Sequence, residues 1–419
     1  MNALLVILKK NFRYYGMIVA LVAAMIFFGV LTDGVLFRPV NLTNLVLQNS
    51  YVLILAVGMM LCILTGNIDL SVGSVVAFVG AVSAMMMVRA NMNPFLAMFL
   101  SLLIGGIIGA WQGLCIAYFR MPAFIVTLAG MLAFRGLAQV ILKGQSYGPF
   151  PRVFQSLSSG YIADPFGGAR LGSVELHVLT LLIGAALSAL IAVGQARERK
   201  RQRRYDFELS PRGVWIAKLV FLIAVIMTFS IVFALYRGVP NILALLGCLI
   251  VLYHFVTTKT VQGRHIYALG GNAKAAKLSG IKTERVMFWV YANMGVIAAL
   301  AGMVFAARLN VATPKAGQNF ELDAIAACYI GGASTTGGVG TIIGAIVGGL
   351  FMGVLNNGMS ILGVSIDWQQ AIKGFVLLAA VGFDLYSKMR ASGGDSLSKG
   401  GLSIFGLRLD FLKRREALR

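Results

Sequence analysis

Residues 263–281, Gly-Arg-His-Ile-Tyr-Ala-Leu-Gly-Gly-Asn-Ala-Lys-Ala-Ala-Lys-Leu-Ser-Gly-Ile, form a short polar passage between two long apolar runs. Within this passage Asn272 is a good helix N-cap, the six residues after it favour helix, and Gly280 is a suitable stop. We expect a short helix that displays the small side chains of Ala275 and Ala276. Such a helix could dock into a groove on a partner protein. The alternative is a plain connecting loop that happens to be helical.

The sequence around this passage is strongly apolar. The chain has 419 residues, of which 58% are hydrophobic and 12% are charged, and its mean hydropathy is +0.84. A soluble domain cannot bury that much apolar surface. We therefore predict an all-α polytopic membrane protein with about 10–12 transmembrane helices between residues 16 and 386, some of them discontinuous.

The basic residues lie mainly in the connecting segments. The formal net charge is +21, but this charge follows the positive-inside pattern of membrane proteins and does not point to nucleic acid. A lesser contribution is attraction to the head groups of membrane lipid. The segments predicted to be cytoplasmic are an N-terminus (1–15), a basic loop (195–213), the loop that contains the opening passage (259–286) and a basic tail (387–419).

A polar break interrupts the apolar sequence at residues 65–74, Thr-Gly-Asn-Ile-Asp-Leu-Ser-Val-Gly-Ser. An unpaired backbone group costs several kcal/mol in lipid, so such a break must face other helices or a water-filled cavity. One interpretation is a discontinuous helix beside a translocation path, with Asp69 at a half-helix N-terminus and Ser71 and Ser74 nearby. The other is that Asp69 only caps a helix near the membrane interface.

Further polar residues lie within later apolar runs. Glu321 and Asp323 begin a predicted helix, where carboxylates suit the helix dipole. Asn356 and Asn357 either pack between helices, which we favour, or line a polar path. Arg135 is either an interior functional residue or a side chain that reaches the outer interface.

Two short segments resemble each other. Residues 128–131, Leu-Ala-Gly-Met, are followed by Arg135, and the same four letters at 300–303 are followed by Arg308. Transporters are often built from two related halves, so this similarity suggests two weakly related halves here.

The sequence contains no motif for catalysis or for nucleotide binding. It lacks a Gly-x-x-x-x-Gly-Lys-Ser/Thr phosphate loop, a nucleophile elbow and an HExxH pair, and its four cysteines have no metal-ligand spacing. We therefore expect no enzymatic activity, no catalytic residue, no metal site and no bound cofactor.

Several motifs together resemble the ribose/xylose-type permease family of ABC importers. They are the opening passage, residues 68–74 (Ile-Asp-Leu-Ser-Val-Gly-Ser), 321–327 (Glu-Leu-Asp-Ala-Ile-Ala-Ala), 124–128 with Arg135-Gly136, and 355–359 (Leu-Asn-Asn-Gly-Met). The resemblance covers most of residues 40–386. An additional hairpin between about 177 and 240 is similar to the xylose and multiple-monosaccharide subgroup.

The resemblance implies a permease in the bacterial inner membrane that imports monosaccharides such as xylose, glucose, galactose or arabinose. It implies three partners: a cytoplasmic ABC ATPase that uses the ATP, a periplasmic sugar-binding protein, and a second permease copy. The alternatives are a permease for another small polar solute, such as a nucleoside or polyol, and an ion-coupled secondary transporter. The residues expected to form the ATPase-coupling loop are Gly263, Arg264, Gly270, Asn272, Ala275, Ala276, Ser279 and Gly280.

Overall fold

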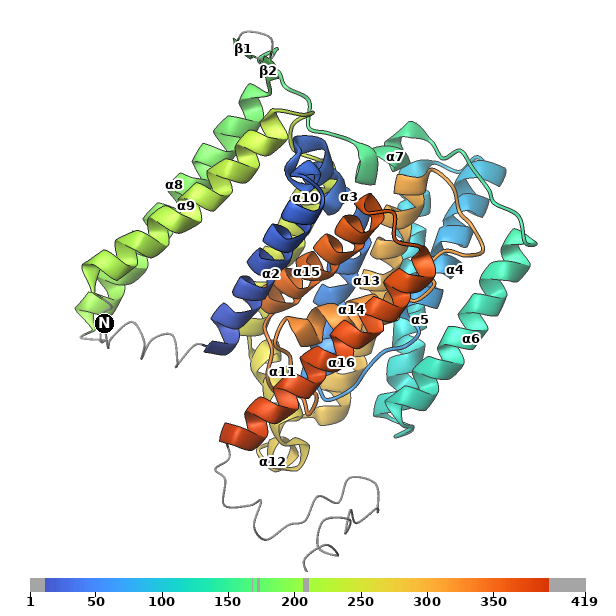
Figure 1. Ribbon diagram of the computed structural model, residues 1–419. Coiled ribbons are helices and arrows are strands. Elements are labelled where there is room, and N and C mark those ends of the chain that lie inside the picture. Colours follow the sequence, from blue (N-terminus) through green and yellow to red (C-terminus); the bar gives the residue numbers. More distant parts are fainter. Residues whose placement is uncertain (1–11, 168, 172–173, 206–210, 392–419) are drawn as a thin grey trace, which may run out of the picture.

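The computed structural model describes residues 12–167, 169–171, 174–205 and 211–391 (Figure 1). Most of the expected N-terminal segment and tail, residues 1–11 and 392–419, lie outside the described residues. The first half of the chain contains α2 (Phe12–Leu31), η1 (Val35–Phe37), α3 (Pro39–Leu64), α4 (Val72–Ala84), η2 (Met85–Arg89), α5 (Pro94–Ala117), α6 (Ala123–Leu142), α7 (Arg152–Ser159), β1 (Ala169–Leu171), β2 (Val174–Leu176) and α8 (Val178–Arg204). The second half contains α9 (Arg212–Ala234), α10 (Asn241–Lys259), α11 (Val261–Gly271), α12 (Ala273–Leu278), α13 (Thr283–Leu309), α14 (Phe320–Ile330), α15 (Ile342–Ile361) and α16 (Ile366–Ala391).

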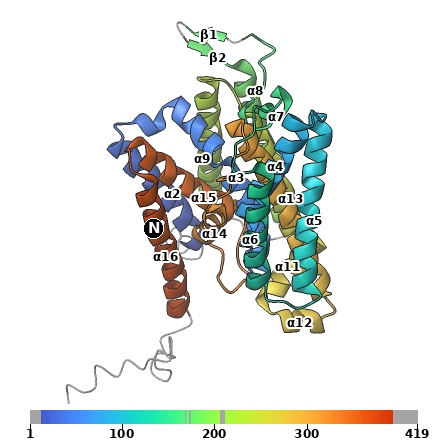
Figure 2. The ribbon, with the colours of Figure 1, turned by 90° about the vertical axis from the view of Figure 1, so that its right-hand side faces the viewer.

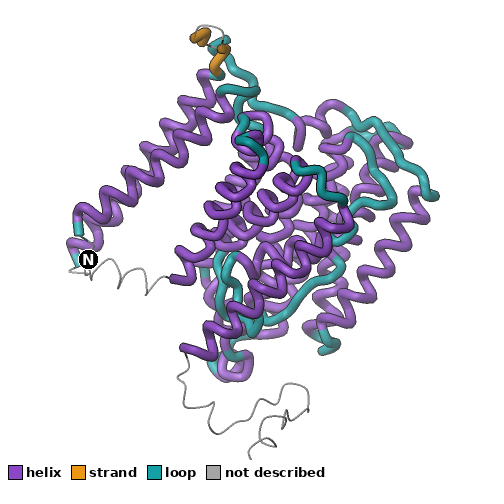
Figure 3. Tube along the Cα trace, in the orientation of Figure 1, coloured by secondary structure: helices purple, strands orange, loops and turns teal. Residues whose placement is uncertain are grey.

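The fold is an α-helical membrane bundle, as predicted. Within the described ranges, nine helices are long and apolar enough to cross a membrane, and the apolar part of α2 (Gly16–Leu31) is shorter. The two short strands form one antiparallel hairpin at one end of the bundle (Figure 3). We call this end the outer end and the opposite end, where α12 lies, the inner end (Figure 2).

Two helices start inside the bundle after a non-helical break. Residues 65–71 connect α3 to α4, and residues 310–319, which contain turns and an isolated bridge, connect α13 to α14. We call α4 and α14 the half-helices because each starts after such a break, although η2 continues α4 into a segment (Val72–Arg89) long enough to cross a membrane. With 11 residues, α14 is about 16 Å long, roughly half of a bilayer core.

These two breaks identify two inverted halves. The order of long helix, break, half-helix and two further helices occurs in α3–α6 and again in α13–α16. The halves run in opposite directions, because the inner end of α3 meets the loop that follows α14: Gly338 N donates to Leu64 O. The matching Leu-Ala-Gly-Met segments lie on α6 and α13, which do not correspond in this repeat. That sequence similarity therefore does not mark the halves and reflects the small residues common in packed helices.

Small residues set the closest helix contacts. Along α5, Gly105 and Gly109 face Gly295 of α13. A Cβ atom at Gly109 would lie 2.3 Å from the carbonyl oxygen of Tyr291, which no contact allows. In the same way Gly348 of α15 packs on the backbone of Ala327, and these are the small-residue faces that let membrane helices approach.

The additional hairpin is formed by α8 and α9, which pack on each other and little on the rest of the bundle. The expected basic loop is partly helix, because α8 continues through the basic residues to Arg204, and residues 206–210 lie outside the described chain. The predicted coupling loop is also largely helical, since α11 and α12 occupy most of it.

The α5–α13 contact gives a stability test. We expect Gly109→Leu to destabilise the protein by more than the roughly 1–3 kcal/mol typical of overpacking, because the obstructing atoms are backbone. Thermal unfolding of the purified protein, followed by fluorescence, measures the effect. Gly136→Leu on α6 is the control, since a Cβ there meets nothing within 4 Å. Equal stability of the two variants would contradict this packing.

Candidate functional site

The first half-helix begins at a buried carboxylate. Asp69 is 2% exposed, and its Oδ1 accepts hydrogen bonds from the backbone N–H of Ser71 at 2.8 Å and from Ser71 Oγ at 2.7 Å. Gln112 of α5 donates from Nε2 to Ser71 Oγ at 2.8 Å. The structure therefore shows Asp69 organising the turn into α4 while Gln112 ties that turn to α5. Gln112 was not predicted, although an amide inside an apolar helix is a visible signal.

The second half-helix begins beside the first. The N-terminal turn of α14 contains Glu321 and Asp323, both buried. Gly73, in the first turn of α4, lies against the carbonyl oxygen of Gly317 and the carboxylate of Glu321. The N-termini of the two half-helices therefore meet inside the bundle, where both helix dipoles present their positive ends.

Two cations hold the chain that leads into α14. Arg135 of α6 donates from Nη1 to Ala316 O at 2.7 Å and from Nη2 to Gly317 O at 3.0 Å. Lys373 of α16 forms an ion pair with Asp323, Nζ to Oδ1 at 2.9 Å. Of the two interpretations of Arg135, the structure supports the interior one. Lys373 was not identified from the sequence.

Some buried oxygens at this junction and on α15 have no hydrogen-bond partner among the described residues. At the junction they are Ser74 Oγ and Glu321 Oε2, and on α15 it is Asn357 Oδ1. Asn357 and the half-buried Asn356 lie near the outer end of α15, where the neighbouring Gly353 and Gly358 pack on α3 and α2. The structure thus brings Asp69, Ser71 and Ser74 to the junction and places the two asparagines in a helix-packing region.

The expected short helix is present at the inner end as α12. Asn272 accepts a hydrogen bond at Oδ1 from Ala275 N, 3.0 Å away, and Gly280 ends the segment with a left-handed φ of 84°. Ala275 is exposed, whereas Ala276 is buried against its own chain. Among the large apolar side chains of the described residues, Leu278 is the most exposed, at 90%.

Of the other predicted residues of this loop, one is buried in a helix contact and two are exposed. Gly263 is buried at the corner between α10 and α11, where a Cβ would lie 2.3 Å from Thr257 O. Arg264 is exposed, and Ser279 is an exposed residue at the C-terminal end of α12.

Gly270 packs this inner helix pair against the end of α3 and against the loop that follows α14. A Cβ at Gly270 would lie 1.7 Å from Leu64 O and 2.6 Å from Gly338 N, so only glycine fits. Leu64 ends α3 directly before the first break, and Gly338 lies in the loop that follows α14. Tyr267 of α11 donates from Oη to Gly340 O at 2.6 Å, and burial raises the pKa of its phenol above the ordinary value. The helix pair α11–α12 is thus attached to the inner ends of both discontinuous segments.

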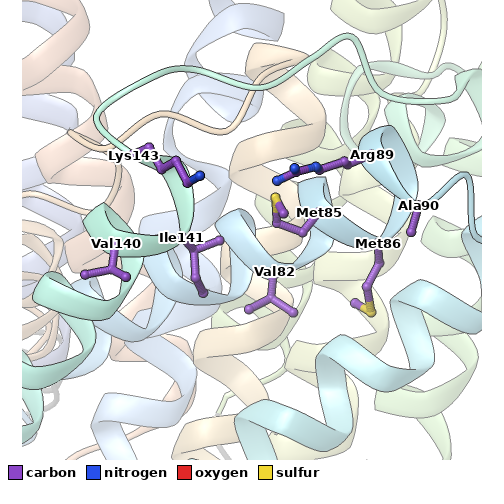
Figure 4. A pocket seen from close by; sticks show the side chains of 8 residues that line it. All are labelled: Val82, Met85, Met86, Arg89, Ala90, Val140, Ile141 and Lys143. Carbon is purple, nitrogen blue, oxygen red and sulfur yellow. The ribbon is translucent and has the colours of Figure 1, made fainter.

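A separate open cavity of about 710 Å³ lies at the outer ends of α4 and α6. Arg89 and Lys143 approach it from opposite sides, with Met85 and Met86 below them (Figure 4). This cavity therefore has a positively charged rim. No group of three or more His, Cys, Asp or Glu side chains in the described part of the chain could hold a metal ion.

Half-helix ends that meet inside a membrane bundle, joined to a helix pair that projects at the inner end, define a membrane transport permease. A family model described as branched-chain amino acid transport system / permease component matches residues 41–381. The chain therefore belongs to this permease family.

Individual relatives agree with this assignment. The chain is 38% identical to the xylose transport system permease protein of Haemophilus influenzae over 380 residues, covering 91% of this chain and 98% of the relative. It is 40% identical to the xylose transport system permease protein of Escherichia coli K12 over 383 residues, with coverage of 91% and 94%. It is 37% identical to the ribose import permease protein of the same strain over 343 residues, with coverage of 81% and 84%. No solved structure matches the chain.

The Lys373–Asp323 pair gives a test of the junction. We expect Lys373→Met to destabilise the protein by about 3–5 kcal/mol, because it leaves a buried carboxylate uncompensated. The double variant Lys373→Met/Asp323→Asn removes both charges and is expected to recover most of that loss. Thermal unfolding of both proteins measures the difference. A double variant no more stable than the single one would contradict a direct ion pair.

Proposed function

We propose that this chain is the membrane-spanning subunit of an ABC importer for monosaccharides in a bacterial inner membrane. The observation that carries the proposal is the attachment of α11–α12, through Gly270, to the inner ends of both discontinuous segments. A force applied to this helix pair reaches both half-helices at once. The names of the relatives, xylose and ribose permeases, support a sugar as the cargo.

The force comes from a separate ATPase. The sequence has no phosphate loop, so ATP is bound and hydrolysed by a partner subunit and not by this chain. The exposed surface of α12 suits a docking role, because Leu278 is exposed on a helix that also contains Lys274 and Lys277. Lys277 and Glu284 form an ion pair at 2.7 Å that joins α12 to α13, and α13 leads directly to the second break.

The movement follows from this geometry. When α12 is displaced, Gly270 shifts against Leu64 and Gly338, and the first break and α14, which adjoin these two residues, change their position. The half-helix ends near Asp69 and Glu321 then separate or approach, which opens the path on one side of the membrane and closes it on the other. A binding protein at the outer end supplies the sugar, so the permease itself needs no tight sugar site.

A second copy of the chain completes the pathway. Helices α6 and α16 lie on either side of α14 on one face of the bundle (Figure 2). Their outward side chains are large and apolar, and Arg135 and Lys373 reach from these helices to the chain entering α14. We assign this face to the contact between two copies, with the path between them. The exposed apolar residues that support it are Phe124, Ile125, Leu132, Leu137 and Val140 of α6 and Trp368, Phe375 and Leu378 of α16.

Reconstitution tests the proposed function. We expect proteoliposomes that contain this chain, its ATPase and its binding protein to accumulate radiolabelled xylose, glucose, galactose, arabinose or ribose only when ATP and the binding protein are both present. Omitting each component in turn provides the controls. Uptake of a nucleoside or polyol but of no sugar would show that the cargo is that solute and not a monosaccharide. Uptake by this chain alone, driven by a proton or sodium gradient, would show that the protein is a secondary transporter and not part of an ABC importer.

The surface of α12 gives a second test. We expect Leu278→Ser to reduce ATP-driven uptake by about tenfold or more, because it removes the main apolar anchor from the docking surface. Leu278→Met keeps the apolar surface and serves as the matched control. Because the side chain is exposed, neither variant changes folding. Undiminished uptake by Leu278→Ser would contradict the assignment of this surface.

A further inference from the structure

The outer ends of α4 and α6 form the two walls of the open cavity of about 710 Å³. On the α4 side Val82, Met85 and Met86 line it, and their spacing places them on one helix face. On the other side Val140 and Ile141, in the last turn of α6, line it. The body of this cavity is therefore apolar.

The wall on the α4 side ends in an unusual turn. Residues Met85–Arg89 form η2, a π-helix in which Ala90 N donates to Met85 O at 3.0 Å, five residues away. Such turns are rare, and many of them lie at functional sites. The unbranched side chains of Met85 and Met86 belong to this turn, and methionine adapts its shape to irregular apolar partners. A flexible hydrocarbon chain suits this wall.

Two cations lie at the mouth of the cavity. Arg89 and Lys143 are both exposed and point toward each other above the two methionines (Figure 4). No acidic residue lines the cavity, and no carboxylate in the part of the chain that the structure describes forms an ion pair with either cation. Because like charges repel, an anion between the two cations stabilises this arrangement.

The phosphate of a lipid fits these two cations. An arginine guanidinium can bind two phosphate oxygens at once, and a lysine ammonium adds a compact positive charge. A free inorganic phosphate would leave the apolar walls below the cations exposed to water. A phospholipid covers both parts, since its phosphate is joined to acyl chains. The arrangement thus favours a phospholipid over a small ion.

The position of the cavity agrees with a lipid. It lies at the outer ends of two segments that are long and apolar enough to cross a membrane, opposite to α12 (Figure 2). The side chain of Val140 is apolar and yet 70% exposed, as is typical of a surface that faces lipid. Val140 also belongs to the face that we assign to the second copy, so the cavity lies at the margin of that contact.

We propose that the cavity between the outer ends of α4 and α6 binds an anionic phospholipid of the outer leaflet. Its phosphate lies between Arg89 and Lys143, and an acyl chain lies against Met85, Met86 and Val140. The lipid thereby joins the outer end of the first half-helix to α6. This site is separate from the path between the half-helices and takes no part in recognising the transported solute.

A fluorescent label at the mouth of the cavity tests the proposal. In full-length protein without the four native cysteines, Ala90→Cys is labelled with bimane, since Ala90 is exposed and lines the cavity. The label is quenched by nitroxide-labelled phosphatidylglycerol or phosphatidylethanolamine in mixed micelles. We expect half-maximal quenching at a mole fraction about tenfold lower for phosphatidylglycerol. Equal quenching by the two lipids would overturn the proposal.

Two variants of the labelled protein separate the head group from the acyl chain. Arg89→Gln/Lys143→Gln removes both cations and is expected to abolish the preference for phosphatidylglycerol. Met86→Gln/Val140→Gln makes the walls polar and is expected to weaken the binding of both lipids severalfold. All four positions are exposed or half-buried, so neither variant removes a buried packing contact.

Each variant has a matched control outside the cavity. Arg38→Gln/Arg152→Gln removes two exposed cations elsewhere at the outer end and should keep the preference. Leu96→Gln/Leu103→Gln makes two apolar positions of α5 polar, each about half exposed, and should leave the quenching unchanged.

Two further outcomes would contradict the site. A preference that survives Arg89→Gln/Lys143→Gln would refute the head-group contact, and unchanged binding to Met86→Gln/Val140→Gln would refute the acyl-chain contact. If the parent protein shows no lipid preference and Arg89→Gln/Lys143→Gln instead weakens binding of the sugar-binding protein, the cavity is a protein docking surface and the proposal is wrong.

Discussion

Backbone N–H and C=O groups inside a membrane need hydrogen-bond partners, and the two breaks in the helices are the places where this protein meets that requirement without helix. At the first break a carboxylate, Asp69, accepts from the backbone of Ser71. At the second, the guanidinium of Arg135 donates to the carbonyls of Ala316 and Gly317. The polar side chains buried in this bundle therefore hydrogen-bond to irregular backbone, which is one reason that they are tolerated there.

The same breaks allow the helices on either side of them to change their relative position. A continuous helix transmits a push as a rigid rod, whereas an extended stretch of a few residues can bend by rotating its backbone dihedrals. The end of α3 at Leu64 and the loop after α14 at Gly338 are both held by backbone contacts with Gly270, where no larger residue fits. Because these contacts are made by closely packed backbone atoms, a displacement of α11–α12 also displaces Leu64 and Gly338.

Much of this arrangement could be predicted from the sequence, and the remainder shows what local patterns leave out. Asn272 and Gly280 predicted the bounds of α12 because capping depends on neighbouring residues alone. Asp69 marked the first break because a carboxylate in apolar sequence stands out. Lys373 could not be paired with Asp323, since that contact joins residues 50 positions apart. The burial of Ala276 and the exposure of Leu278 depend on how α12 rests on its neighbours, so neither could be predicted from the local sequence.

The most direct test of the account is to lock the first break to the loop that follows α14. Gly66 and Thr336 lie side by side, since a Cβ at Gly66 would be 3.7 Å from Thr336 O. In a background without the four native cysteines, Gly66→Cys/Thr336→Cys can be joined with a short, reducible thiol reagent, and each single variant serves as a control. We predict that cross-linking stops ATP-driven uptake and that reduction restores it. Full uptake by the cross-linked protein would show that the first break and the loop after α14 do not move against each other, and it would contradict the proposed coupling.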